Sequence, residues 1–260
     1  MHYSFCAPQQ YRFYFLIYYL KTFILFSKYE QARAANVALL RSCLPHAELV
    51  DAVYASKQKI PFLQKAMDCA RLRTGIPLLA GEIGCLLSHR NIWRKIMEGP
   101  GNASDHFLIL ESDSTINNLA AFNTFLDASD ASVSPQIYDL FFYGAWDGNM
   151  QLFRSTKKQL NPDYTIGEPF IKSIYCTYGY SLNKKAAALL LKRTGLFNYP
   201  VDQFKRFFLQ HELKLGGIMP ELVSTCGADS HIRKKPVFTL VNDVFLTLLT
   251  IKNKLICFFK

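Results

Sequence analysis

The pattern of apolar and polar residues predicts that strands and helices alternate along the chain. Residues 22–26 are apolar and β-favouring, residues 28–43 are rich in Ala, Leu, Arg and Gln, and residues 48–54 (ELVDAVY) have the composition of a second strand. This order predicts a strand, a helix and a strand, which is the βαβ unit of an α/β sheet. Residues 107–110 and 138–143 are also apolar and predict buried strands.

Helices are predicted between and after these strands. The segments with helical composition or spacing are residues 86–97, 120–128, 184–193 and 202–213. The chain has no internal repeat and no low-complexity linker. We therefore expect one α/β domain over residues 22–232, an extension over residues 1–21, and a separate C-terminal segment over residues 233–260.

The C-terminal segment has the spacing of an amphipathic helix. Its apolar residues follow one another at steps of four and three: Val241, Val244, Leu248, Ile251, Leu255 and Phe258. This spacing places them along one side of a helix. Two interpretations are open, because such a helix can dock on the protein core or lie in a membrane interface with its basic residues toward an anionic leaflet.

Composition and charge narrow the function classes. The chain has 260 residues, of which 50% are hydrophobic and 19% charged, and this excludes disordered and collagen-like proteins. The formal net charge of +10 predicts an anionic partner. Six basic residues and one acidic residue fall in the last thirty, so half of this charge lies beside the amphipathic segment. No arginine-rich or RNA-binding aromatic motif occurs, and we expect no nucleic-acid partner.

Neither export nor a membrane span is predicted. The apolar run over residues 13–26 contains Lys21 and is shorter than the roughly 20 residues of a spanning helix. It also lacks the basic start and the small-residue cleavage site of a signal peptide. The seven cysteines are scattered, without CxxC pairs or zinc-ligand spacing, and predict buried thiols in a reducing compartment.

The end of the strand at residues 107–110 carries the first candidate chemistry. Glu111, Ser112 and Asp113 follow it directly. Because side chains alternate along an extended chain, Glu111 and Asp113 point the same way. Ligands of open α/β sheets collect beyond the carboxyl ends of strands, and two carboxylates there suit a hard divalent cation that also binds phosphates. A solvated loop is the alternative.

Two other features leave their roles open. Asp202 is either the N-cap of the predicted helix or a general base in a pocket. Gly81 and Gly84 lead into a helix and either admit a ligand or pack the helix start closely. The absence of P-loop, GxGxxG, HExxH and GxSxG motifs weakens the nucleotide hydrolase, Rossmann oxidoreductase, zinc protease and serine hydrolase interpretations.

Six strings in order along the chain resemble glycosyltransferase family 25, the lipooligosaccharide galactosyltransferase family of bacterial surface glycan synthesis. They are ELVDAV, GEIGCLLSH, LILESD, IYDLFFYG, CTYGYSLNKKAAALLL and YPVDQF, and the second is the most specific. The resemblance covers residues 22–232 and implies a GT-A-like, Rossmann-type α/β/α sandwich. It also implies an inverting transferase that moves a hexose, above all galactose, from a UDP-sugar to a lipooligosaccharide or related surface glycan.

The resemblance also implies a metal site. Glu111 and Asp113 stand where the family carries an acidic triplet that holds a divalent metal, manganese or magnesium. Ser112 replaces the middle acid, which predicts weaker ion binding or a changed ligand set. This departure keeps an alternative open, in which the protein is a catalytically inactive relative that binds glycan or membrane.

The remaining roles are likewise implied by the resemblance. Asp202 is the expected catalytic base, with Asp147 in reserve. The residues expected to bind the donor are Asp51, Glu82, Ser88, His89 and Glu111. The expected partners are a UDP-sugar, a lipid-linked oligosaccharide acceptor, and an anionic membrane surface reached through the C-terminal helix. We therefore expect a cytoplasmic protein, peripheral on the inner face of the bacterial inner membrane.

Overall fold

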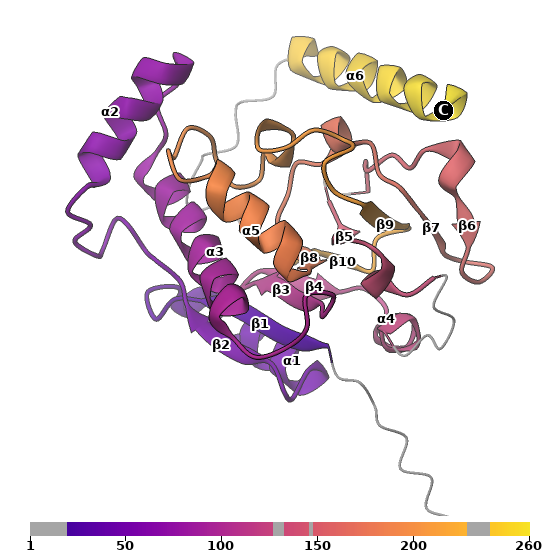
Figure 1. Cartoon of the computed structure of the whole chain (residues 1–260), viewed down its shortest axis with the longest axis horizontal. Coiled ribbons are helices and arrows are strands. Elements are labelled where there is room, and N and C mark those ends of the chain that lie inside the picture. The colour runs from indigo at the N-terminus through magenta and orange to yellow at the C-terminus, as the bar shows by residue number, and fades with distance from the viewer. Residues whose placement is uncertain (1–19, 127–132, 146–147, 228–239) are drawn as a thin grey trace, which may run out of the picture.

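A mixed eight-stranded sheet forms the centre of the computed structural model (Figure 1). The structure describes residues 20–126, 133–145, 148–227 and 240–260, without the side chains of residues 240–245. The sheet order is β2-β1-β3-β8-β5-β9-β7-β6, and β4 and β10 form a second, two-stranded sheet. The expected α/β class is confirmed.

The described elements have the following bounds. The strands are β1 (Lys21–Phe26), β2 (Glu48–Asp51), β3 (Phe107–Glu111), β4 (Ser114–Ile116), β5 (Leu140–Gly144), β6 (Lys158–Gln159), β7 (Thr165–Gly167), β8 (Gly179–Leu182), β9 (Leu215–Met219) and β10 (Val223–Thr225). The α-helices are α1 (Ala34–Cys43), α2 (Leu63–Thr74), α3 (Ala80–Glu98), α4 (Leu119–Leu126), α5 (Lys184–Arg193) and α6 (Leu240–Phe259). Short 3-10 turns include η1 (Gln31–Arg33), η3 (Arg154–Thr156), η4 (Ile171–Ser173) and η5 (Phe204–Arg206).

The strand order reverses between β1 and β3. The β1-α1-β2 unit places β2 on one side of β1, and β3 pairs with the other side, all three strands being parallel. Such a reversal opens a crevice at the carboxyl ends of the strands, where α/β proteins bind ligands. Strand β8 is antiparallel to β3, so the chain just before β8 reaches the same edge.

Helices cover both faces of the sheet. Phe23 and Leu25 of β1 pack in one core cluster with residues of α3 and α5. Ile24, which points the opposite way, packs in a second cluster with residues of α1 and α4. The arrangement is a three-layer α/β/α sandwich, with α3 and α5 on one face and α1 and α4 on the other (Figure 1).

Most predicted elements form, and one does not. The helix expected over residues 184–193 is α5 with the same bounds, and the strand expected over residues 48–54 ends at Asp51. The helix expected over residues 202–213 is wrong, because only η5 forms there. Phe204, Phe207 and Phe208 are all buried, so tertiary packing overrides local helix propensity in this segment.

Helix α6 docks with an unexpected face. Leu248, Ile251, Leu255 and Phe258, the described members of the predicted stripe, are 48% to 59% exposed. Asn253 and Cys257 are buried against the body of the protein instead. Docking through the apolar stripe is therefore wrong, and the stripe faces outward. Among the described helices, none is both long and apolar enough to cross a membrane.

The cysteines are less buried than the sequence predicts. Six lie in the described part of the chain, and all are free thiols. Only Cys257 is buried, Cys226 is exposed, and Cys43, Cys69, Cys85 and Cys176 are half-buried.

Candidate functional site

Two adjacent cavities lie at the carboxyl ends of β1, β2 and β3. The first has a volume of about 160 Å³ and the second about 320 Å³. Cys85 and Glu111 line both of them, so the two cavities share a wall. Together they occupy the point where the strand order reverses, which is where the topology predicts a ligand site.

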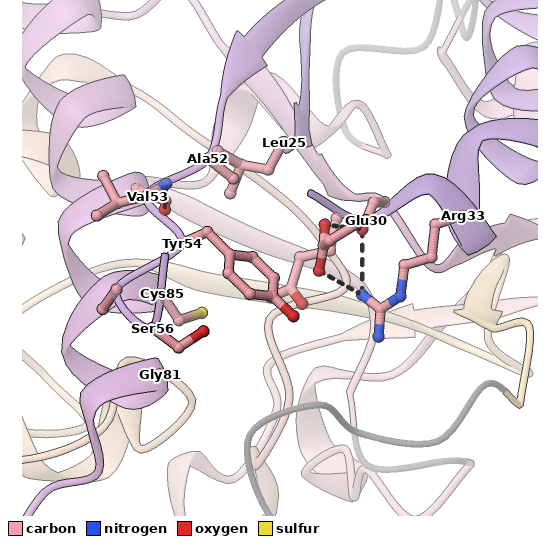
Figure 2. Close-up of a pocket in the computed structure, with 13 residues that line it drawn as sticks. Leu25, Glu30, Arg33, Ala52, Val53, Tyr54, Ser56, Gly81 and Cys85 are labelled. Carbon is pink, nitrogen blue, oxygen red and sulfur yellow. Dashed lines mark hydrogen bonds and ion pairs between the residues drawn. The ribbon is translucent and has the colours of Figure 1, made fainter. Parts of the chain in front are cut away.

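The first cavity is built from the segments that follow β1 and β2 and from the start of α3. Figure 2 shows the ring of Tyr54 between Cys85 and Ser56 on one side and Glu30 and Arg33 on the other. Tyr54 comes just after β2, and its ring also contacts that of Tyr29, with centroids 5.8 Å apart. An aromatic ring held in this way offers a face on which a planar ligand group can stack.

Helix α3 packs closely against the segment that follows β2 and so fixes this wall of the first cavity. A Cβ atom on Gly84 would lie 2.5 Å from the carbonyl oxygen of Val53, so only glycine allows this approach. The hydroxyl of Ser88 accepts a hydrogen bond from the Val53 amide and donates one to the Gly84 carbonyl, both at 2.8 Å. Of the two roles left open for Gly84, helix packing is the observed one. Glu82 is buried and caps the helix by accepting a hydrogen bond from the Leu79 amide at 2.8 Å.

A chain of hydrogen bonds holds Glu111 on the shared wall. The Trp93 indole donates to the Tyr180 hydroxyl at 3.0 Å, and this hydroxyl lies 2.8 Å from Nδ1 of His89. Nε2 of His89 lies 3.3 Å from Oε1 of Glu111, which also accepts from Thr177. Because a carboxylate only accepts, Nε2 of His89 donates to Glu111, and the Tyr180 hydroxyl bridges the Trp93 indole and Nδ1 of His89.

These bonds also set the charge of Glu111. Burial would raise the pKa of Glu111, but the hydrogen bonds and charge of His89 and the bond from Thr177 outweigh burial and hold this pKa below its ordinary value. Glu111 is therefore a carboxylate at neutral pH, in a fixed orientation.

Arg33 joins three acidic or polar groups across the crevice. Its Nη2 lies 3.2 Å from Oδ2 of Asp113, and its Nη1 lies 3.6 Å from Oε1 of Glu30. Nη1 also donates to the Ser112 hydroxyl at 3.1 Å, and this hydroxyl donates to Oε2 of Glu30 at 3.1 Å. Glu30 thus brings a carboxylate to Ser112.

Arg33 satisfies only one of the two carboxyl oxygens of Asp113. Burial and the neighbouring Glu111 raise the pKa of Asp113 to about 6, and Arg33 opposes this rise. Oδ1 of Asp113 is buried and has no hydrogen-bond partner among the described residues. This oxygen is a ready ligand for a cation.

Asp202 lies on the wall of the second cavity. No α-helix begins there, and the residue before η5 is Gln203, so the N-cap interpretation is wrong. The pKa of the Cys85 thiol shows how much negative charge surrounds it. Burial raises this pKa well above its ordinary value, and the nearby carboxylates raise it further; they belong to Glu111, Asp202, Asp113 and Glu30. Four carboxylates therefore surround the shared wall.

Metal-binding groups converge on the same wall. The ligand atoms of Cys85, His89 and Glu111 lie within 4.8 Å of one another. Burial and the surrounding carboxylates raise the pKa of the Cys85 thiol, which disfavours the thiolate form. The oxygens of Glu111 and Asp113 are the donors that Mg²⁺ and Mn²⁺ prefer, so the residues fit a hard divalent cation.

The structure brings together most of the residues predicted from the sequence. Glu82, Glu111, Asp113 and Asp202 line the second cavity, and Ser88 lines the first. His89 is fully buried behind Glu111. Asp51 is exposed at the end of β2 and lines neither cavity, and Asp147 lies outside the described residues.

Sequence reasoning missed Glu30, Arg33, Tyr54 and Thr177. Glu30 and Arg33 come after the carboxyl end of β1, as Asp113 comes after that of β3, so the same positional argument applies to them. Thr177 precedes a strand that runs the opposite way, and no local signal marks it.

An α/β sandwich with a carboxylate-lined crevice at its switch point is typical of enzymes that bind charged ligands. The model of glycosyltransferase family 25, described as LPS biosynthesis protein, matches residues 33–205, which is more than half of the chain. The chain belongs to this family. Membership implies a glycosyltransferase of LPS biosynthesis, with a nucleotide-sugar donor and a glycan acceptor. No curated protein matches the sequence closely enough to count as a relative.

Proposed function

We propose that the protein is an inverting glycosyltransferase that moves a hexose, galactose in the first instance, from a UDP-sugar to a lipooligosaccharide or related surface glycan. The observation that carries this proposal is the pair of adjacent cavities at the switch point, with Glu30, Glu111, Asp113 and Asp202 around the shared wall. The family supports sugar transfer itself, and the site supports the division of roles that follows.

The charge of the site favours a donor bound together with a divalent cation. Arg33 is the only lysine or arginine among the described residues that line the two cavities. A nucleoside diphosphate brings further negative charge, which four carboxylates repel. Glu111 and Asp113 would hold Mn²⁺ or Mg²⁺, and such an ion, when bound, neutralises the diphosphate leaving group.

We place the nucleoside in the first cavity and the transferred sugar in the second. Tyr54 offers its ring to the base, and Arg33 lies where it can contact the diphosphate. Ser88 and His89 act mainly by holding the cavity wall and Glu111. Asp51, which ends the strand that leads into this wall, stays a proposed donor contact.

Asp202 is the proposed catalytic base in the second cavity. The acceptor hydroxyl oxygen attacks the anomeric carbon from the face opposite the diphosphate, while its proton passes to the Asp202 carboxylate. The bond between the anomeric carbon and the phosphate oxygen breaks, and its electron pair leaves with UDP. Asp147 stays the reserve base.

The alternative is an inactive relative that only binds glycan or membrane, because Ser112 replaces an acid. The position of Glu30 is an argument against this alternative. Its carboxylate accepts a hydrogen bond from Ser112 and supplies a negative charge where Ser112 replaces the acid. An active transferase would bind both the nucleotide and the metal, whereas an inactive relative would not.

We also propose that α6 holds the enzyme on an anionic membrane surface at the cytoplasmic face. Leu248, Ile251, Leu255 and Phe258 form the outward stripe, and Lys252 and Lys254 flank it on its two sides. Lysines beside an apolar stripe are typical of helices that lie in an interface, where the charged ends reach the lipid headgroups.

Calorimetric titration of the full chain with UDP, with and without Mn²⁺, tests the proposed site. We expect saturable UDP binding that strengthens with Mn²⁺ and loses this dependence in Asp113→Ala. Asp163→Ala removes an exposed aspartate elsewhere and is the control. Folded protein that binds no UDP under either condition would favour the inactive relative instead.

A further inference from the structure

A third cavity, lined by basic residues, lies between α6 and the body of the protein. It has a volume of about 320 Å³, and its cationic lining residues are Lys172, Lys205, Arg206 and Lys252. No acidic residue lines it within the described part of the chain. Four cations without a facing carboxylate make this cavity suited to an anionic group.

Asn253 adds a buried side-chain amide to the lining of this cavity. The residue is 3% exposed and lines the cavity from the buried face of α6. Its Nδ2 is buried and has no hydrogen-bond partner among the described residues. A buried amide donor without a partner is destabilising, so a ligand oxygen that accepts a hydrogen bond from it stabilises the complex.

The basic cavity is next to the second cavity of the site. Tyr175 lines both of them, and the ammonium group of Lys205 lies 3.6 Å from the centre of its ring. The segment that carries Asp202 continues directly into Lys205 and Arg206. A molecule whose hydroxyl reaches Asp202 can therefore place another part of itself between α6 and η5.

We infer that this cavity binds an anionic group, a phosphate or a carboxylate, carried by the acceptor close to the hydroxyl that is glycosylated. The inference rests on the proposed function for the assignment of Asp202, and the anion site itself rests on the cavity alone. The four carboxylates of the transfer site repel a negatively charged acceptor, and the basic cavity offsets this repulsion. An anionic membrane lipid shares the same headgroup chemistry and is the competing source.

The anion site can be tested without any sugar transfer. We expect inorganic phosphate, titrated into the ¹⁵N-labelled full chain, to shift the side-chain amide signal of Asn253 saturably. Lys252→Gln should weaken this binding about tenfold, because it removes one charged partner. Lys254→Gln makes the same change on the same helix, outside this cavity, and should leave the affinity within about twofold. An unmoved Asn253 signal, or equal effects of the two variants, would overturn the anion site.

A second comparison separates the two sources of the anion. We expect Lys252→Gln to raise KM for a phosphorylated soluble acceptor about tenfold, to leave kcat and the donor KM unchanged, and to bind phosphatidylglycerol vesicles like Lys254→Gln. Weaker vesicle binding with an unchanged acceptor KM would assign the cavity to lipid and refute the acceptor. If UDP does not bind but the Asn253 titration succeeds, the proposed function fails and the anion site stands.

Discussion

Arg33 and Asp113, 80 residues apart in the chain, form an ion pair across the switch point, with Nη2 of Arg33 3.2 Å from Oδ2 of Asp113. The pair connects the segment after β1 with the turn after β3, so it ties together the two strands between which the crevice opens. It also leaves Oδ1 of Asp113 without a hydrogen bond among the described residues. One aspartate is therefore held by an arginine through one oxygen and offers the other to a ligand.

Replacing Arg33 should weaken donor binding. In Arg33→Met the cavities lose their only described lysine or arginine, and hydrogen bonds to charged groups contribute about 1.5 to 3 kcal/mol. We expect the Kd of UDP, measured calorimetrically with Mn²⁺ present, to rise at least about tenfold. Arg41→Met removes an exposed arginine from α1 and should change it little. Equal UDP affinity of both variants would remove Arg33 from the site.

Removing the Tyr180 hydroxyl should loosen Glu111. Tyr180→Phe leaves the buried Trp93 and His89 nitrogens without their partner, which costs about 1 to 3 kcal/mol. We expect the free energy of unfolding in urea to fall by this amount and UDP binding with Mn²⁺ to weaken. Tyr143→Phe, which loses one longer hydrogen bond to Ser181, is the control. If this control weakens UDP binding as much, the chain of bonds to Glu111 has no special role.

The positional rules of α/β folds predict part of this site from the sequence alone. Glu111 and Asp113 were predicted because they follow an apolar run and alternate along it. Arg33 and Glu30 fell inside the predicted helix at residues 28–43, whose composition hid the turn that precedes α1. Their partners come from residues 112 and 113, and such long-range pairs leave no trace in local periodicity.

Helix α6 shows the same limit in another form. Periodicity correctly predicted an apolar stripe, but it could not say which face docks. The docked face includes the polar Asn253, and side-on contacts such as Arg154 over the Phe258 ring, at 4.6 Å, add to the attachment. Such contacts depend on the surfaces of other elements.

The helix predicted over residues 202–213 does not form, because the burial of its phenylalanines decides the backbone conformation there.

Gly84→Ala should disturb the donor cavity. The new Cβ would lie 2.5 Å from the Val53 carbonyl oxygen, and a backbone atom cannot move aside cheaply. We expect a loss of about 1 to 3 kcal/mol in the free energy of unfolding and a higher Kd for UDP. In Gly195→Ala the nearest atom is 3.6 Å away, so stability and binding should stay close to the wild-type values. Wild-type behaviour of Gly84→Ala would contradict the close packing of α3.

Polar substitutions on the outward stripe of α6 should release the protein from membranes. Burying one leucine contributes about 1.5 to 3 kcal/mol, so the full chain with Leu248→Ser and Leu255→Ser should float with phosphatidylglycerol vesicles much less than wild type. Leu209→Ser and Leu196→Ser, also on exposed leucines, are the matched control. Equal flotation of both double variants would refute membrane binding through α6.

Turnover of nucleotide sugars tests whether this crevice is the site of sugar transfer. Nucleotide release should be measured for UDP-, GDP- and CMP-sugars with a lipooligosaccharide acceptor, with and without Mn²⁺, for wild type, Asp113→Asn and Asp202→Asn. We expect metal-dependent release of UDP from UDP-galactose by the wild type, and a loss of at least about a hundredfold in kcat for Asp202→Asn, as is typical of a general base. Undiminished turnover in both variants would contradict the assignment of this crevice as the transfer site.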